Sequence, residues 1–110
     1  MAKYATMNTA RQSTRYAARA RILKALAHPA RLRIVDALRR GPRCVCALRD
    51  VVGSDLSTVS RHLGVLRNAG IVADERRGVR IFCRLRCPCV TEFFACAEKV
   101  LRTADRVGRG

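Results

Sequence analysis

The chain has 110 residues, of which 49% are hydrophobic, and its 23 lysines and arginines outnumber 8 aspartates and glutamates to give a formal net charge of +15. This length suits one domain, and the hydrophobic share supports a core, which excludes an intrinsically disordered protein. No apolar run reaches the roughly 20 residues of a membrane span, and no apolar signal segment opens the chain, so we expect a cytoplasmic protein.

The positive charge is unevenly distributed. It is concentrated in two groups, one before Asp36 and a second, made of arginines, between residues 76 and 86. Such charge favours a polyanionic partner, with nucleic acid as the first expectation and an anionic membrane surface as the second. The first group precedes Asp36, the first acidic residue, and consists of Lys3, Arg11, Arg15, Arg19, Arg21, Lys24, Arg31 and Arg33.

The N-terminal part of the chain predicts a basic arm and two helices. Residues 1–12 show no apolar periodicity and are predicted to form a mobile basic arm, with an arginine-bearing transit peptide as the alternative. A first helix ends at the His28–Pro29 step, and Pro29 suits the first turn of a second helix, which ends at Gly41–Pro42. The helical spacing of the first begins at about Arg15 and includes Tyr16, Ala20, Ile22, Leu23, Leu26 and Ala27.

The middle of the chain predicts a helix-turn-helix at residues 44–69. A short helix runs from the start of this segment to about Val51, and a glycine makes the turn. Asp55 or Ser57 caps the next helix, and Gly70 closes it as the residue after its C-cap. The inward positions of this second helix are Val59, Leu63 and Leu66, spaced i, i+4, i+7.

After Gly70 the apolar period becomes alternating, which predicts a β-hairpin at residues 71–86 with its turn at Arg77–Gly78. Pro88 then opens a last helix, residues 88–104, and residues 105–110 form a tail. On the second strand one face carries Val79, Ile81, Cys83 and Leu85, and the other carries Arg80, Phe82, Arg84 and Arg86.

This order predicts a mainly α fold with one β-hairpin: a winged helix-turn-helix with an extra helix at each end, spanning residues 13–104. A domain this small buries a modest share of its surface, so pairing with a second copy is expected. No enzyme is expected, because no pattern links His28 or His62 to a thiol and no phosphate loop or carboxylate pair occurs.

The helix at residues 57–69 opposes its buried row with a polar face. Short hydroxyls and Gly64 let this face approach a groove closely, and Arg61 is long enough to reach a guanine edge or a phosphate. Such a pattern alone also describes an ordinary helix with a solvated face. The preceding turn and the following arginine-bearing hairpin favour DNA reading. The face consists of Ser57, Ser60, Arg61, Gly64, Arg67 and Asn68.

Four segments carry a resemblance to a known family. They are Leu26-Ala27-His28-Pro29-Ala30-Arg31-Leu32-Arg33-Ile34, Cys44-Val45-Cys46-Ala47-Leu48, Ser57-Thr58-Val59-Ser60-Arg61-His62-Leu63 and Leu66-Arg67-Asn68-Ala69-Gly70-Ile71-Val72. Over about residues 20–86 the chain resembles the ArsR-type arsenical-resistance repressors, which are bacterial metal-sensing winged-helix proteins. The resemblance implies a nucleoid-associated repressor that binds double-stranded operator DNA and has no membrane partner.

The resemblance also implies the arrangement of the complex. It implies a homodimer through the first and last helices, with helix 57–69 in the major groove and the hairpin as a wing near the minor groove. It further implies that inducer binding releases the operator, and that DNA binding itself needs no cofactor. The predicted DNA-binding residues are Ser57, Thr58, Ser60, Arg61, His62, Arg67, Arg76, Arg77 and Arg80.

His62 has two interpretations. A lone histidine on a helix is often structural, but its place in the Ser-Arg-His-Leu signature favours a phosphate or base contact. His28, directly before Pro29, is predicted to be a helix-boundary residue.

The six cysteines are predicted to be reduced, because the pairs Cys44/Cys46 and Cys87/Cys89 are too tightly spaced to bridge comfortably. Cys44 and Cys46 match the thiolate pair that the resembling repressors use for arsenite, antimonite or soft divalent metals. Residues i and i+2 of a helix do not face each other. Joint ligation therefore requires non-helical backbone at Cys44 or distortion of the helix, which would change the DNA-binding shape.

Arsenite takes three sulfurs, and resembling repressors often place a third cysteine where this chain has Arg49. The preferred hypothesis is a site of three or four thiolates from Cys44, Cys46, Cys87 and Cys89, within one chain or shared with the partner subunit. Alternatively, Cys87 and Cys89 form a separate weak site or have no role. Cys83 and Cys96 are predicted to be small buried apolar residues.

We therefore expect a transcriptional repressor for which arsenite or antimonite is the inducer, with cadmium, lead or zinc as alternatives. A thiol redox-sensing regulator, in which Cys44 and other exposed thiols oxidise reversibly, is the main alternative. A regulator that does not respond to metal is a further alternative. An architectural DNA binder is disfavoured because the predicted reading face carries specific polar residues.

Overall fold

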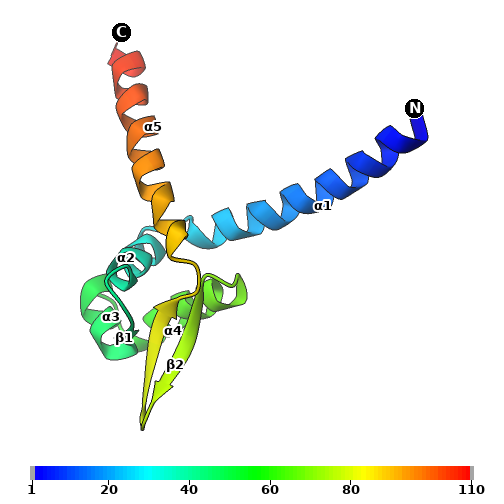
Figure 1. Ribbon diagram of the computed structural model, residues 1–110. Coiled ribbons are helices and arrows are strands. Elements are labelled where there is room, and N and C mark those ends of the chain that lie inside the picture. Colours follow the sequence, from blue (N-terminus) through cyan, green and yellow to red (C-terminus); the bar gives the residue numbers. More distant parts are fainter. Residues whose placement is uncertain (1, 110) are drawn as a thin grey trace.

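The computed structural model describes the backbone of residues 2–109 and the side chains of residues 11–106. Helices α2, α3 and α4 and a small sheet form the body, and α1 and α5 project from it in different directions (Figure 1). The elements in chain order are α1 Ala2–Leu26, α2 Pro29–Leu38, β1 Arg43–Cys44, α3 Val45–Val52, α4 Leu56–Asn68, β2 Val72–Arg77, β3 Arg80–Leu85, the 3₁₀ helix η1 Pro88–Thr91 and α5 Glu92–Arg109. The predicted mainly α winged helix-turn-helix is confirmed.

One hydrophobic core joins every element of the body. The apolar row of α4 lies at its centre, and the ends of α1 and the sheet close it from either side. These residues are buried because their i, i+3, i+4 spacing in the helices and alternate spacing in β3 place them on one face each. The most deeply buried side chains are Ile34, Val35, Leu48, Val59, Leu63, Leu66, Val72 and Cys83.

The sheet has three antiparallel strands in the order β1-β3-β2. In the hairpin, Val72 pairs with Leu85 and Arg77 with Arg80. Gly78 takes φ +63° at the first position of the two-residue turn, where a hairpin of this length needs a residue without a Cβ. The two-residue strand β1 was not predicted from the sequence, because so short a strand has no period of its own. It pairs Cys44 with Phe82 of β3.

The helix boundaries of the body follow the predicted signals. His28 is the N-cap of α2, where its ring accepts a hydrogen bond from the backbone N–H of Ala30 at 3.0 Å, and Pro29 begins the helix. Gly70 follows α4 at φ +80°, and the N–H of Ile71 donates to the carbonyl of Leu66 at 3.0 Å. This bond closes the helix in the pattern typical of a glycine C′ residue.

The terminal helices are longer than predicted. The predicted arm of residues 1–12 is helical from Ala2 on, and the predicted tail is helical as far as Arg109. The apolar period marks only the part of a helix that packs, whereas strong helix formers without proline continue the helix beyond it. The last segment also begins differently, since η1 precedes α5.

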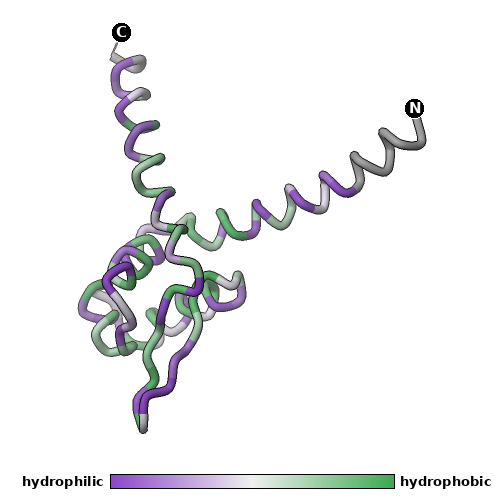
Figure 2. The backbone as a smooth tube through the Cα atoms, viewed as in Figure 1, coloured by the Kyte–Doolittle hydropathy of each residue, from purple (hydrophilic) through white to green (hydrophobic). Residues whose placement is uncertain are grey.

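Exposed apolar side chains are concentrated on the two projecting helices. Tyr16 and Leu23 of α1 and Val100 and Leu101 of α5 are each more than half exposed. Hydrophobic residues recur along both helices near the body, and hydrophilic residues gather toward the tip of the hairpin (Figure 2). Val79, predicted to face the core, is instead 98% exposed, because it lies in the turn rather than in β3. Within the described chain, no helix is long and apolar enough to cross a membrane.

Candidate nucleic-acid interface and thiol sites

Helix α4 presents a polar face opposite its buried row. Ser57, Ser60 and Arg61 are exposed, and Thr58 is half-buried at the edge. Apart from its chain neighbours and the adjacent backbone of α4, no atom lies within 4 Å of the point that a Cβ on Gly64 would occupy. Packing within the chain therefore does not require a glycine there, and the flat surface remains open to a groove.

The first turn of α4 holds its hydroxyls in place. The Ser57 hydroxyl donates to the carboxylate of Asp55 at 2.7 Å. Hydrogen bonds from the Thr58 side chain first, and from Ser57 second, lower the pKa of Asp55. Both hydroxyls are thus oriented by the residue at the helix N-cap, which orders two of the predicted DNA-contacting side chains.

Arg67, for which a DNA contact stays a prediction, forms an ion pair with the wing. Its guanidinium lies 2.9 Å from the carboxylate of Asp74 in β2, and both side chains are partly exposed. An exposed pair of this kind contributes little stability. It does join the last turn of α4 to the hairpin, so the two elements that are predicted to contact DNA are also linked to each other.

Of the three wing arginines that are predicted to contact DNA, one is held by neighbouring side chains and two are not. Arg77 bonds the carboxylate of Glu75 at 2.9 Å and lies over the ring of Phe82, 5.1 Å from its centroid. Arg76 and Arg80 are exposed. Among the side chains that the structure describes, no ion pair involves either of them. These two arginines are therefore free to meet phosphates.

His62 does not lie on the exposed face. Its ring contacts that of His28, with centroids 4.5 Å apart, and its Nδ1 lies 3.4 Å from a guanidinium nitrogen of Arg31. Burial first, and then the charges of His28, Arg31 and Arg61, lower its pKa. A phosphate or base contact by His62 stays a prediction. Burial turns the ring toward α2, where it fixes α4 against the rest of the body.

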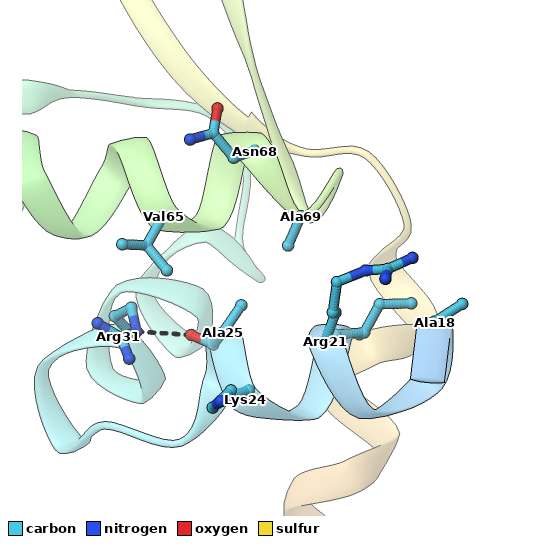
Figure 3. A pocket seen from close by; sticks show the side chains of 9 residues that line it. Ala18, Arg21, Lys24, Ala25, Arg31, Val65, Asn68 and Ala69 are labelled. Atoms are coloured by element: carbon cyan, nitrogen blue, oxygen red, sulfur yellow. Dashed lines mark hydrogen bonds between the residues drawn. The ribbon is translucent and has the colours of Figure 1, made fainter. Parts of the chain in front are cut away.

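A basic cleft lies between α1 and α4 (Figure 3), which the sequence did not predict as a site. It has a volume of about 620 Å³ and is lined by Arg21, Lys24 and Arg31 together with Asn68 and five apolar residues. The Arg31 Nε donates to the carbonyl of Ala25 at 2.6 Å, which fixes one wall. The only sequence signal for this cleft was the absence of acidic residues before Asp36.

The first thiol pair lies where β1 becomes α3. Cys44 is the N-cap of α3 with φ −72° and ψ 158°, an extended conformation, and Cys46 lies in the first turn. Cys44 is half-buried and Cys46 is exposed. The backbone at Cys44 is therefore non-helical, as joint ligation by the two sulfurs requires.

The second thiol pair flanks Pro88 after the wing. The sulfurs of Cys87 and Cys89 lie 2.8 Å apart, and both residues are exposed. A hydrogen bond with Cys87 is the largest of the effects that raise the pKa of Cys89. Each thiol therefore already faces the other.

The two thiol pairs are not brought together within one chain. Cys44 pairs with Phe82, and Cys87 lies beyond the other end of β3, roughly 16 Å away at about 3.3 Å per residue. Among the described residues, no group of three His, Cys, Asp or Glu side chains could hold a metal ion. A site made from all four sulfurs of a single chain is thus not formed here. A site shared between subunits remains a prediction.

The two remaining cysteines differ from each other. Cys83 is 1% exposed, and burial is the main cause that raises the pKa of its thiol to about 11. This confirms Cys83 as a small core residue with an unreactive thiol. The same prediction is wrong for Cys96, which is exposed in the chain because α5 projects from the body.

Comparisons with known proteins show which family the chain resembles in sequence and fold. The family model described as bacterial regulatory protein, arsR family, matches residues 28–74. The HTH-type transcriptional regulator Rv0081 of Mycobacterium tuberculosis is 42% identical over 95 residues, which cover 84% of this chain and 83% of that protein. Its crystal structure matches with a TM-score of 0.72 over 84% of this chain and 95% of that one.

Two further solved structures show the same architecture. The homodimeric winged helix-turn-helix DNA-binding domain Mb0332 from Mycobacterium bovis is 35% identical, with a TM-score of 0.73 over 84% of this chain and 85% of that one. The transcriptional repressor BigR from Xylella fastidiosa is 33% identical, with a TM-score of 0.70 over 84% and 94%.

The fold, the polar face of α4 and the relatives define a DNA-binding transcriptional regulator rather than an enzyme. The chain belongs to the ArsR family of bacterial regulatory proteins.

Proposed function

We propose that the chain is a homodimeric repressor that leaves its operator when thiolates of Cys44 and Cys46 bind arsenite, antimonite or a soft metal ion. The observation that carries this proposal is the extended backbone of Cys44 directly before α3, next to the exposed Cys46. Thiolates suit soft ions, and this junction lets two sulfurs two residues apart converge without unwinding a helix.

DNA binding is supported by the arrangement of charge. Arg61 on α4 and Arg76 and Arg80 on the wing are exposed, and the chain carries a net charge of +15. A polar helix face that enters the major groove, flanked by cations that meet phosphates, is how winged helix-turn-helix proteins read a duplex. The relative BigR is named a transcriptional repressor, which supports the same role here.

A dimer through α1 and α5 is supported by the apolar side chains that these helices leave exposed. Phe93 is 48% exposed and Leu101 57% exposed, although both belong to the apolar stripe of α5. A monomer rarely leaves so many large apolar side chains in water on one element. The relative Mb0332 is described as homodimeric, in line with this proposal.

The position of Cys44 and Cys46 suggests how ligand binding releases the protein from its operator. Strand β1 pairs with β3 of the wing through Arg43 and Cys44, and α3 packs against α4. Ligation that draws Cys44 toward Cys46 therefore shifts a junction shared by the wing and the reading helix. Inducer and operator then favour different shapes of the protein, which is a coupling between two sites.

The third sulfur for arsenite is assigned to Cys87 or Cys89 of the partner subunit. Within one chain the second pair lies too far from Cys44 to share an ion, given the roughly 16 Å of strand between them. A soft ion that is bound by only two protein thiolates would not need a sulfur from the partner subunit. Soft divalent ions therefore remain the alternative inducers at Cys44 and Cys46.

The proposal is tested on a duplex that the protein selects from a random library, with affinity measured by fluorescence anisotropy in reducing buffer. Arsenite or antimonite is expected to lower this affinity about tenfold or more. Cys44→Ser/Cys46→Ser is expected to keep the affinity and lose the response. Cys83→Ser is the matched control, since its thiol is buried, and should retain the response. Unchanged release from the Cys44→Ser/Cys46→Ser variant would contradict the assignment.

A redox regulator is the second candidate, favoured by the 2.8 Å approach of the Cys87 and Cys89 sulfurs. Hydrogen peroxide would oxidise the two thiols to a disulfide and be reduced to two waters, which take up the two thiol protons. Release from the selected duplex by peroxide, reversed by dithiothreitol and absent with arsenite, would establish this function in place of the first.

A further inference from the structure

The basic cleft between α1 and α4 is lined by cations without acidic partners. Among the described side chains of its lining, Arg21, Lys24 and Arg31 are cationic and none is acidic. No ion pair between described side chains involves any of these three. In the view of Figure 3 the two arginines lie toward opposite ends of the cleft, and Lys24 lies between them. This lining therefore favours an anionic ligand.

The walls between the two arginines are apolar. They consist of small side chains of α1 and, across the cleft, of Val65 and Ala69 on α4 (Figure 3). The cleft measures about 620 Å³, a volume typical of sites for small organic molecules, which combine apolar walls with a few polar groups. A bare inorganic ion would leave these walls in contact with water. The lining therefore fits an organic anion.

The positions of the two arginines indicate two anionic groups rather than one. Arg31 is held at Ala25, because its Nε donates to the Ala25 carbonyl at 2.6 Å. Arg21 lies four residues before Ala25 in α1, which is about 6 Å along the helix axis. Two carboxylates on opposite sides of a benzene ring are separated by a similar distance. A guanidinium can bind each carboxylate through two parallel N–H···O bonds.

We propose that the basic cleft binds an organic dicarboxylate. One carboxylate pairs with Arg31 and the other with Arg21, and the charge of Lys24 attracts both. The apolar middle of the ligand packs against Val65 and Ala69 of α4.

The cleft is separate from the surfaces that the proposed repressor uses. Tyr16 and Leu23, which are exposed on the α1 face proposed for the dimer, lie seven residues apart on one side of the helix. At about 100° per residue, Ala18 and Ala25 of the cleft lie on the opposite side. The cysteines and the predicted DNA-binding residues do not belong to the lining. The cleft therefore overlaps neither with this dimer face nor with the proposed DNA surface.

Arg31 links the cleft to the helix that is proposed to read DNA. Its Nη1 lies 3.4 Å from Nδ1 of His62 on α4. A carboxylate that binds Arg31 draws the guanidinium toward the cleft and away from His62. Because this contact helps to hold the orientation of α4, ligand binding should lower the affinity for operator DNA. This consequence rests on the proposed function, whereas binding of the ligand does not.

Binding is tested by an NMR titration of the isotope-labelled full chain without DNA, at pH 8. The probe is benzene-1,4-dicarboxylate, and phenyl phosphate is a control of equal charge with only one anionic group. The dicarboxylate should bind at least about fivefold more tightly than phenyl phosphate and shift the amide signals of Ala25 and Ala69. Uncharged benzene-1,4-dimethanol should not bind. Equal affinity for the two dianions, or shifts confined to other parts of the chain, would overturn the proposal.

Charge variants locate the site on α1. Arg21→Gln/Lys24→Gln should weaken dicarboxylate binding about tenfold or more, because charge-assisted hydrogen bonds to the ligand are lost. Arg15→Gln/Arg19→Gln removes the same charge from the same helix but outside the lining, and should weaken binding less than about twofold. Equal losses in the two double variants would show attraction by net charge alone and overturn the proposal.

A second pair of variants tests the apolar wall. Val65→Trp fills part of the cleft and should abolish dicarboxylate binding. Val51→Trp is the matched control, since Val51 on α3 and Val65 are both 37% exposed and Val51 lies outside the lining. Urea denaturation checks that both variants fold. Full binding by a folded Val65→Trp variant would place the ligand elsewhere.

The consequence for DNA is measured separately, at constant ionic strength. Saturating benzene-1,4-dicarboxylate should lower affinity for the selected duplex about fivefold or more, and Arg21→Gln/Lys24→Gln should remove this effect. Unchanged affinity for the duplex would overturn the coupling through Arg31. Failure of arsenite to release the duplex would remove the proposed function and leave dicarboxylate binding intact. Absence of dicarboxylate binding would remove the present inference and leave arsenite-dependent release intact.

Discussion

The two faces of α4 differ in what they interact with. One face buries Val59, Leu63 and Leu66 almost completely in the core. The opposite face exposes Ser60 and Arg61, and no described ion pair involves Arg61. Residues that stabilise the fold and residues that are proposed to contact DNA therefore lie on different faces of the same helix. Substitutions on the first face should mainly lower stability, and substitutions on the second should mainly lower DNA affinity.

Between its buried and its exposed face, α4 has two flanks, whose side chains hold the helix in its orientation. On one flank His62 contacts His28 and Arg31, and on the other Arg67 pairs with Asp74 of the wing. The flanks do not add large stability, because their polar contacts are partly exposed. They set the direction in which the recognition face points.

The largest expected effect comes from the buried face. Leu63→Ala removes a side chain that is 1% exposed and should lower the free energy of unfolding by about 2–5 kcal/mol. Val65→Ala, on the same helix but partly exposed, should change it by about 0.5 kcal/mol. Urea denaturation measures both. Equal effects of the two substitutions would contradict the assignment of the faces.

The recognition face should give a specific loss of DNA affinity. Arg61→Ala is expected to weaken binding to the selected duplex by about 1–3 kcal/mol if the arginine reads a base edge. Arg80→Ala on the wing should instead weaken selected and random duplexes alike and reduce the salt slope by about 1. Anisotropy titrations at several salt concentrations distinguish them. A uniform loss with Arg61→Ala would reassign that arginine to phosphate.

Gly64 should show opposite effects on folding and on binding. Because no atom beyond the adjacent backbone lies within 4 Å of the added Cβ, Gly64→Ala should raise the free energy of unfolding by up to about 1 kcal/mol. The same methyl group on a face that enters a groove should lower affinity for the selected duplex by about tenfold or less. If affinity is unchanged, this part of α4 does not approach DNA closely.

The smallest expected effect is a pH dependence from the flank. The pKa of His62 is lowered from its ordinary value of 6.5, mainly by burial and then by His28, Arg31 and Arg61. The unfolded chain therefore binds more protons just below pH 6.5, and stability should fall as the pH decreases through that range. His62→Gln should flatten this part of the profile in urea denaturation between pH 5 and 8. An unchanged profile would exclude His62 as its source.

Most of the fold could be predicted because periodicity and glycines report local structure directly. The spacing of Val59, Leu63 and Leu66 and the position of Gly70 defined α4 correctly. Strand β1 could not be predicted, since its pairing with β3 is a contact between distant residues. The start of α1 was placed too late, because residues 1–12 carry no apolar period in the sequence although the helix begins at Ala2.

The candidate site was predicted less completely, because side-chain partners are set by packing. The sequence identified Arg61 and the two Cys-x-Cys pairs, but not that His62 turns toward Arg31 or that Arg67 pairs with Asp74. Nor could equal spacing show that Cys44 lies in a strand while Cys87 and Cys89 lie at the start of η1 with their sulfurs 2.8 Å apart. The two Cys-x-Cys pairs have the same spacing but different surroundings, because different secondary-structure elements hold them.

The central claim is that metal binding at the thiols at the start of α3 and DNA binding at the polar face of α4 weaken each other. A metal titration, followed by thiolate absorbance, tests this claim. The titration is done on the free protein and on the protein saturated with the selected duplex. The duplex should weaken metal binding at Cys44 and Cys46 by the same factor by which the metal weakens DNA binding, because coupling is reciprocal. Equal metal affinity with and without the duplex would contradict the claim.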